Sequence, residues 1–437
     1  MVGYCLVRKK MIGMTERMKK RKIFTGISAI IITAVIAAWF SGCGAGREGG
    51  EGLEEYKQEQ MADQEDLADI ETDASKEDNP DYKVKTLDMG SEEKKYITEK
   101  LFSAMEICRS IYEGARIEDV HNIVLEEEHV HKMTAQIAAE DLTVICGSRD
   151  ENMQNYERVD ACLKKAKKKE VAETDFYSVN INGIFRYYKL MFEGGTLFVT
   201  FAGATFDKNG KPVLQQIEKI QAYAWEYTEK GWLIWEKALS RNPEMDMHIF
   251  YRILPLDEKC REVAEKCIRP VNYFGNNLFL TDWDEGSLEN IEFNDLFDFL
   301  YSMETGTKPE KERYENGIPA EEFENITGRY FHTTAEQLRQ YGAYNEETGT
   351  YPWLAVNGWN RVPQMQPFPE VVSCTENEDG TLSARVEAVY VEEGRDCLFA
   401  HVVTLRMEEN GGFKYLGNKI DWENAYRVPA YKARRDF

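Results

Sequence analysis

The sequence predicts an α+β protein built from two modules, each consisting of helices followed by an antiparallel sheet. Apolar residues first recur every three to four positions, which is typical of helices, and then give way to strand-like runs; this change occurs twice along the chain. Turn signals rich in Gly, Asn and Asp separate the strand-like runs. With 437 residues and 43% hydrophobic content, the chain has enough apolar material for two or three packed domains.

The N-terminal residues predict a location outside the cytoplasm. A basic run at residues 19–22 precedes an uncharged apolar segment at 23–40, and Ser41-Gly42-Cys43 follows. This is the pattern of a secretory signal covering residues 1–42, with Met1 or Met18 as its start. The Ser-Gly-Cys motif resembles the bacterial lipobox, which implies a lipid anchor of the palmitate type on Cys43. The alternative is an uncleaved signal anchor, because the apolar segment is just long enough to span a bilayer.

Residues 43–90 predict the lipidated cysteine and an acidic, disordered tether. From residue 44 onward this segment holds fifteen acidic and five basic residues and few large apolar ones. Such a composition cannot bury enough surface to offset the entropy of the chain, and like charges extend it. The net charge of −23 also excludes nucleic acid as a partner, since binding phosphate requires a basic face.

The first module is predicted to cover residues 91–240. Its first helix follows from seven apolar residues at helical spacing, namely Ile97, Leu101, Ala104, Met105, Cys108, Ile111 and Tyr112. Further helices are predicted at 118–139 and 152–168, and a meander of four or five strands follows from residue 174. This order of elements resembles the NTF2-like fold, which implies a curved sheet that wraps around the N-terminal helices and forms a pocket.

A connecting helix is predicted within residues 241–270, and the second module within 271–425. The connecting helix follows from one apolar stripe, formed by Cys260, Val263, Ala264, Cys267 and Ile268. The second module is predicted to contain helices at 295–303 and 320–330 and strands at 370–375, 382–391, 397–407 and 413–420. Asn410-Gly411-Gly412 is a hairpin signal between the last two strands.

Several segments of the second module carry a closer resemblance. They are residues 318–324, 330–331, 334–339, 369–372, 379–382 and 414–418. These segments look like an uncharacterised family of predicted lipoproteins from gut Gram-positive bacteria. The resemblance implies a cell-surface location and, because no activity is assigned to that family, it implies no reaction.

Seven cysteines remain once Cys5 and the lipidated Cys43 are set aside. Cys260 and Cys267 are separated by about 10 Å along a helix, which is too far for a disulfide. No CxxC motif occurs. We expect these cysteines to be mostly buried thiols.

Two groups of side chains have the composition of metal ligands. His129 and His131 follow three glutamates, but on a helix they point about 200° apart, which indicates a solvated helix face rather than zinc ligands. Asp282-Trp283-Asp284-Glu285-Gly286 resembles the start of a calcium loop, but the remaining ligands of the EF-hand pattern are missing. We therefore predict no metal site and no cofactor.

Aromatic residues and carboxylates offer the remaining candidates for a binding or catalytic site. Five aromatic residues on two consecutive strands are predicted to fill a core, with a pocket for ligands such as glycans as the alternative; they are Tyr223, Trp225, Tyr227, Trp232 and Trp235. Asp175 and Asp207 are expected near strand ends, where NTF2-like enzymes sometimes carry a base. No nucleophile motif, P-loop or GxGxxG accompanies them. The sequence assigns no catalytic residue.

These observations favour an extracytoplasmic lipoprotein on the outer face of the cytoplasmic membrane, which acts as a ligand-binding or protein-interaction module without catalysis. The expected partners are the membrane, through Cys43, and a protein or small ligand at the cell surface. The alternatives are an envelope enzyme of hydrolase or isomerase type with an NTF2-like pocket, and the solute-binding lipoprotein of a transporter. Residues 426–437 form a basic end, including Arg427, Lys432, Arg434 and Arg435, which is expected to be a solvated tail.

Overall fold

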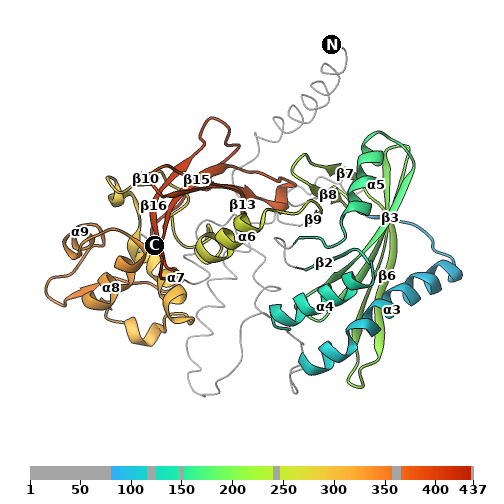
Figure 1. Cartoon of the computed structure of the whole chain (residues 1–437), viewed down its shortest axis with the longest axis horizontal. Helices are drawn as coiled ribbons and strands as arrows, with labels where there is room; N and C mark the ends of the chain where they lie inside the picture. Colours follow the sequence, from blue (N-terminus) through green and yellow to red (C-terminus); the bar gives the residue numbers. More distant parts are fainter. Residues whose placement is uncertain (1–79, 116–124, 148–151, 240–246, 357–365, 435–437) are drawn as a thin grey trace, which may run out of the picture. The chain divides into compact units, whose positions relative to one another are not determined.

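The computed structural model describes residues 80–115, 125–147, 152–239, 247–356 and 366–434 (Figure 1). The predicted signal segment, Cys43 and the tether up to residue 79 lie outside these residues. Two helix-plus-sheet regions follow one another along the described chain, and their strands pair mostly antiparallel. The predicted α+β class is confirmed. Among the residues described, no helix combines the length and the apolar character needed to cross a bilayer.

Helices α3 (Ser91–Ala115) and α4 (Glu127–Ala139) cover one face of the first sheet (Figure 1). The residues that predicted α3 lie at spacings of three to four, so they share one face of the helix. Six of the seven are fully buried, and Ile111 packs against them at the margin of the same core. The helix ends at Ala115.

The first sheet has the strand order β1-β6-β5-β4-β3-β2, with the pair β2–β3 parallel and the other pairs antiparallel. Its strands are β1 (Lys85–Thr86), β2 (Val144–Cys146), β3 (Ala172–Val179), β4 (Phe185–Glu193), β5 (Thr196–Phe206) and β6 (Pro212–Gln221). Neighbouring residues point to opposite faces. Tyr187 joins the core with α3 and α4, whereas Tyr188 joins the core with α5 (Glu157–Lys167) on the other face. Both faces are buried, which explains why these strands are so rich in aromatic residues.

The edge strand β1 corrects the prediction of a disordered tether up to residue 90. Lys85 and Thr86 pair with Gln221 and Ile220 of β6. The amide of Leu87 donates to the carbonyl of residue 219, at 2.8 Å. Backbone hydrogen bonds to a sheet edge therefore order this stretch, and an acidic composition gives no sign of them.

A separate three-stranded sheet follows, formed by β7 (Ala224–Tyr227), β8 (Trp232–Glu236) and β9 (His248–Arg252) in that order. The predicted single meander therefore ends at β6, and the chain starts a second layer. Strand β9 pairs antiparallel with β8, so the predicted module boundary at residue 240 falls inside this sheet.

The second region contains helices packed against a five-stranded sheet of order β10-β16-β15-β14-β13. Its main elements are α6 (Glu258–Val263), the π-helical turn η5 (Ala264–Ile268), α7 (Phe293–Thr305), α8 (Ala320–Tyr330), α9 (Ala335–Tyr341), β10 (Trp283–Asp284), β13 (Phe368–Glu376), β14 (Leu382–Val389), β15 (Ala400–Met407) and β16 (Phe413–Ile420). The predicted stripe of the connecting helix is buried, and all five residues belong to the core of this region. The predicted linker is thus part of the second core.

Side chains from the two regions meet around Trp232 of β8. Trp232 is fully buried, and its ring lies 5.9 Å from that of Phe368 on β13. Arg252 Nη1 of β9 lies 3.0 Å from Glu370 Oε2 of β13, and Trp232 Nε1 donates to the same oxygen at 3.3 Å. Lys230 also forms an ion pair with Glu387 of β14. A buried, charged contact therefore joins the sheet of β7–β9 to the second sheet.

The seven cysteines of the described residues are free thiols. Cys108, Cys146, Cys162, Cys260 and Cys267 are buried, and Cys374 and Cys397 are half-buried. The prediction of mostly buried thiols is confirmed. Burial raises the pKa of Cys108 and of Cys267 to about 12, which keeps both protonated at neutral pH.

Candidate functional site

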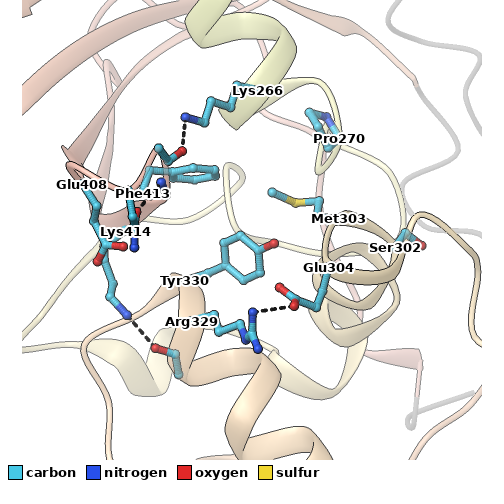
Figure 2. Close-up of a pocket in the computed structure, with 14 residues that line it drawn as sticks. Lys266, Pro270, Ser302, Met303, Glu304, Arg329, Tyr330, Glu408, Phe413 and Lys414 are labelled. Atoms are coloured by element: carbon cyan, nitrogen blue, oxygen red, sulfur yellow. Dashed lines mark hydrogen bonds and ion pairs between the residues drawn. The ribbon is translucent and has the colours of Figure 1, made fainter.

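A pocket with a volume of about 800 Å³ lies in the second region (Figure 2). We call it the Tyr330 pocket, after the side chain that lies across its middle. It is lined by Lys266, Pro270, Ser302, Met303, Glu304, Gly328, Arg329, Tyr330, Glu408, Asn410, Gly411, Gly412, Phe413 and Lys414. These residues come from four segments: η5 and the turn after it, the ends of α7 and α8, and the β15–β16 hairpin.

The ends of α7 and α8 form one wall. Helix α7 stops at Gly306, which has a φ of +72°, a conformation that favours glycine. Its last turn carries Met303 and Glu304 into the pocket. Arg329 lies in the last turn of α8, and its Nη1 is 2.5 Å from Glu304 Oε1. This ion pair links the two helix ends and neutralises both charges (Figure 2).

The β15–β16 hairpin forms the opposite wall. Gly411 adopts a φ of +85°, which explains why glycine occupies the turn. The amide of Gly412 donates to Asn410 Oδ1 at 2.6 Å, and the amide of Gly411 donates to the carbonyl of Glu408 at 3.0 Å. Lys266 Nζ, from η5, donates to the carbonyl of Gly411. The hairpin is therefore fixed at its tip by a lysine from a distant helix.

Lys414 connects the hairpin to α8. Its Nζ donates to the carbonyl of Gly328 at 2.6 Å. Gly328 lies in the last turn of α8, where carbonyls lack a partner within the helix and carry partial negative charge. The ammonium group of Lys414 therefore supplies a hydrogen bond to a carbonyl at the C-terminal end of α8 and holds β16 against this helix.

Aromatic rings give the pocket an apolar centre. The ring of Tyr330 lies 5.6 Å from that of Phe413, in an edge-to-face arrangement. Figure 2 shows Tyr330 between Phe413 and Glu304. Burial, assisted by the carboxylate of Glu304, raises the pKa of Tyr330, so its hydroxyl stays protonated at neutral pH. This hydroxyl offers both a hydrogen-bond donor and an acceptor to a ligand.

Three charged groups of the pocket are not neutralised within the described part of the chain. Lys266 and Lys414 each bond a neutral carbonyl and make no ion pair there. Glu408 likewise makes no ion pair or side-chain hydrogen bond with any described residue. The pocket thus presents two ammonium groups and one carboxylate around an aromatic centre, which suits a ligand that carries both signs of charge.

The two carboxylates considered as bases lie elsewhere and have other partners. Asp175 Oδ1 accepts from Arg158 Nη2 at 2.7 Å, and Oδ2 accepts from the hydroxyl of Tyr187 at 2.9 Å. Asp207 Oδ1 accepts from the amides of Asn209 and Lys211 in the β5–β6 turn, and these hydrogen bonds lower the pKa of Asp207. Neither carboxylate lines the Tyr330 pocket.

The residues considered as metal ligands have structural partners. His129 Nδ1, on α4, lies 3.7 Å from Oε2 of Glu126, the residue that precedes this helix. Asp282 accepts from the amide of Ile420 at 2.7 Å and from Trp422 Nε1 at 2.9 Å. Asp284 Oδ1 accepts from the amide of Gly286 within the same turn. In the described residues no three His, Cys, Asp or Glu side chains are grouped so that they could hold a metal ion.

The aromatic residues of β7 and β8 mostly fill a core. Trp232 and Trp235 are fully buried, and Tyr227 is buried with its hydroxyl donating to Asp160 at 2.7 Å. Trp225 packs against Phe192, with ring centroids 4.7 Å apart. Tyr223, which is 40% exposed, is the exception. Four of the five aromatic residues therefore pack in a core, as predicted.

The basic end corrects another prediction. Arg434 is 1% exposed, and its Nε lies 3.2 Å from Asp295 Oδ1 of α7. It also pairs with Asp298 of the same helix. The expected solvated tail is therefore wrong for Arg434, because two carboxylates far away in the sequence bury its charge. Arg427 is exposed, in an ion pair with Glu393.

Sequence reasoning did not single out the charged residues of the pocket. Lys266 appears only as a polar position beside the apolar stripe of the connecting helix. The hairpin signal at Gly411-Gly412 predicts a turn and gives no sign that this turn forms a wall of a pocket. Tyr330 and Lys414 fall in segments that carried the family resemblance, which was the one available signal.

Comparison with known proteins gives one family. Residues 94–434 match the model of a protein family described as "Family of unknown function (DUF6070)". No curated protein and no solved structure matches the chain. The matched segment includes every residue of the Tyr330 pocket and, apart from β1 and the first three residues of α3, the helices and strands of both regions.

Proposed function

Because this chain belongs to DUF6070, a family without an assigned activity, we propose its function from the Tyr330 pocket. We propose that it is a binding protein that holds a small polar ligand at the outer face of the cytoplasmic membrane. Cys43 would carry its lipid anchor. The observation that supports binding is the pocket of about 800 Å³ with charged groups that no described residue neutralises.

The pocket has the features of a small-molecule site. Its volume falls in the range of about 300–1,000 Å³ that is common for such sites. The apolar part, around Tyr330 and Met303, can pack against a ligand, while Lys266, Lys414 and Glu408 can orient it. The wall is pre-formed, since hydrogen bonds and an ion pair already hold its segments together. A pre-formed wall lowers the entropy that binding must offset.

The proposed membrane anchoring rests on the sequence. The basic run, the apolar segment and Ser41-Gly42-Cys43 precede the family segment, as a lipoprotein signal would. The resemblance to lipoproteins of gut Gram-positive bacteria agrees with this location. We also propose that the first region is related to the NTF2-like fold, because helices precede its meander.

The rival functions have less support. An envelope enzyme would need a free base, yet Asp175 already accepts two hydrogen bonds from side chains and Asp207 holds a turn. A solute-binding lipoprotein of a transporter would need repeated βαβ units with parallel strands. In the described residues the pair β2–β3 is parallel, and the pairs of the larger sheets are otherwise antiparallel.

Two measurements test the proposal. Cells that express the full-length chain are fed an alkyne analogue of palmitate; we expect Cys43 to be labelled and Cys43→Ala to be unlabelled and released from the membrane. Equal labelling of both forms would contradict the anchor.

For binding, the purified full-length chain is unfolded thermally with amino acids, tripeptides, disaccharides, calcium or zinc. A ligand at 100 times its Kd should add about 2.7 kcal/mol to the stability. If no probe shifts the midpoint, the binding proposal fails.

A further inference from the structure

We propose that the Tyr330 pocket binds a short peptide whose amino and carboxyl termini are both free. This inference rests on the proposed binding function and names the class of its ligand. It follows from three features of the pocket: two ammonium groups with unused donors, one carboxylate that pairs with no described residue, and an apolar surface beside them.

Lys266 and Lys414 can bind a carboxylate. An ammonium group has three N–H donors, and each lysine spends one of them on a backbone carbonyl. Their positive charge is not offset by an ion pair within the described residues. Each side chain is also held in position, Lys266 by the hairpin tip and Lys414 by the end of α8. A pair of fixed cations favours an anionic group over a neutral one.

Glu408 can bind an ammonium group. It lies at the start of the β15–β16 turn, and no described residue neutralises its carboxylate. The neighbouring Gly412 makes room for it, because a Cβ at that position would lie 2.7 Å from Glu408 Oε2. The carboxylate therefore lies against the turn, beside Gly412, and both residues line the pocket.

Other ligand classes fit these charges less well. A neutral disaccharide would cover both lysines and Glu408 and leave them without ionic partners, which costs desolvation energy. A ligand with only negative charge would be repelled by Glu408, and a cation by the lysines. A peptide with free termini places one charge of each sign at its ends. Its middle residue can then pack against Tyr330 and Met303, which line the same pocket.

The test uses the full-length protein and pools of random tripeptides. One pool has both termini free, one is N-acetylated, and one is C-amidated; N,N′-diacetylchitobiose serves as the neutral saccharide. Binding is measured by native mass spectrometry and confirmed by calorimetry on the best tripeptide. We expect the free pool to bind, and each cap to weaken binding by about tenfold or more, as expected for losing a charge-assisted contact.

Variants identify the groups that recognise each end. Glu408→Gln should weaken the free and C-amidated peptides about tenfold but leave the N-acetylated one unchanged. Lys266→Gln should do the reverse, weakening only peptides with a free carboxylate. The matched controls Glu409→Gln and Lys419→Gln change the same charges on exposed residues that do not line the pocket. They should bind as the wild type does.

The outcomes separate the two proposals. Equal binding of capped and free pools, or saturable binding of the disaccharide alone, overturns the peptide inference but leaves the binding function standing. If none of these probes binds, and the thermal panel shows no shift either, both proposals fail. Binding of free peptides that neither Glu408→Gln nor Lys266→Gln affects would place the ligand elsewhere and overturn the inference for this pocket.

Discussion

Glu370 lies at the contact between the two regions, and its ionisation should lower the stability of the protein as the pH rises. Replacing Glu370 with glutamine should remove this loss. Glu370 is 1% exposed, and its Oε2 accepts hydrogen bonds from Arg252 at 3.0 Å and from Trp232 at 3.3 Å. Its Oε1 is buried without a hydrogen-bond partner among the described residues. Lys230 and Glu387 are the next charged groups, and they act on Glu370 in opposite directions.

The size of the effect follows from the pKa of Glu370. Burial raises this pKa from its ordinary value of 4.5 to about 6, although Arg252 opposes the change. The folded state therefore binds the proton more tightly than the unfolded state does. This contribution to stability is complete below pH 4.5 and is lost as the pH rises through 6. At about 1.4 kcal/mol per pH unit, the loss amounts to about 2 kcal/mol.

Urea unfolding, followed by tryptophan fluorescence at several pH values from below 4.5 to above 6, provides the assay. The difference in unfolding free energy between wild type and Glu370→Gln should shift by about 2 kcal/mol over this range, to the disadvantage of wild type at higher pH. Glu378→Gln, on an exposed residue, changes the net charge equally and should show a constant difference. A difference for Glu370→Gln that stays constant, or that moves in favour of wild type as the pH rises, would refute the reasoning. Either result would mean that the effect of Arg252 on the pKa of Glu370 cancels or outweighs the effect of burial.

Three further predictions concern stability and are checked by the same unfolding assay. Arg434→Ala should lower the unfolding free energy by about 3–5 kcal/mol, because Asp295 would be left buried and unpaired; Arg427→Ala, in an exposed pair, should cost less than about 1 kcal/mol. Burial lowers the pKa of His401 from 6.5 to about 4, so the wild type should lose about 3 kcal/mol relative to His401→Gln as the pH falls between these values, and a constant difference between the two proteins would contradict this. Gly411→Ala should cost about 1–2 kcal/mol because of the φ of +85°, and an unchanged midpoint would argue against the turn geometry.

Local patterns predicted the elements where many residues share one environment. Helix α8 begins and ends where the sequence placed it, and the stripe from Ile97 to Tyr112 lies in the core. Strand β16 also matches, because the Gly411 turn marks its start. The two-residue strands β1 and β10 were missed, since so short a run has no period to detect.

The candidate site could not be predicted in the same way. The Tyr330 pocket joins segments that are more than a hundred residues apart, such as Lys266 and Gly411. Nothing in the local sequence indicates that a lysine of the connecting helix will meet the tip of a later hairpin. Lys266, Lys414 and Glu408 stand out because no residue that the structure describes neutralises their charge, and this is a property of the folded arrangement.

The sequence by itself determined the α+β class, the run of helices and strands, and the expectation of a lipid anchor at Cys43. These follow from periodicity, turn chemistry and composition, which act over a few residues and are therefore readable along the chain. The tertiary structure decided which charges are buried, such as Arg434 and Glu370, and which stay open in a pocket, such as Glu408. Burial and pairing depend on residues brought together by folding, so no local pattern encodes them.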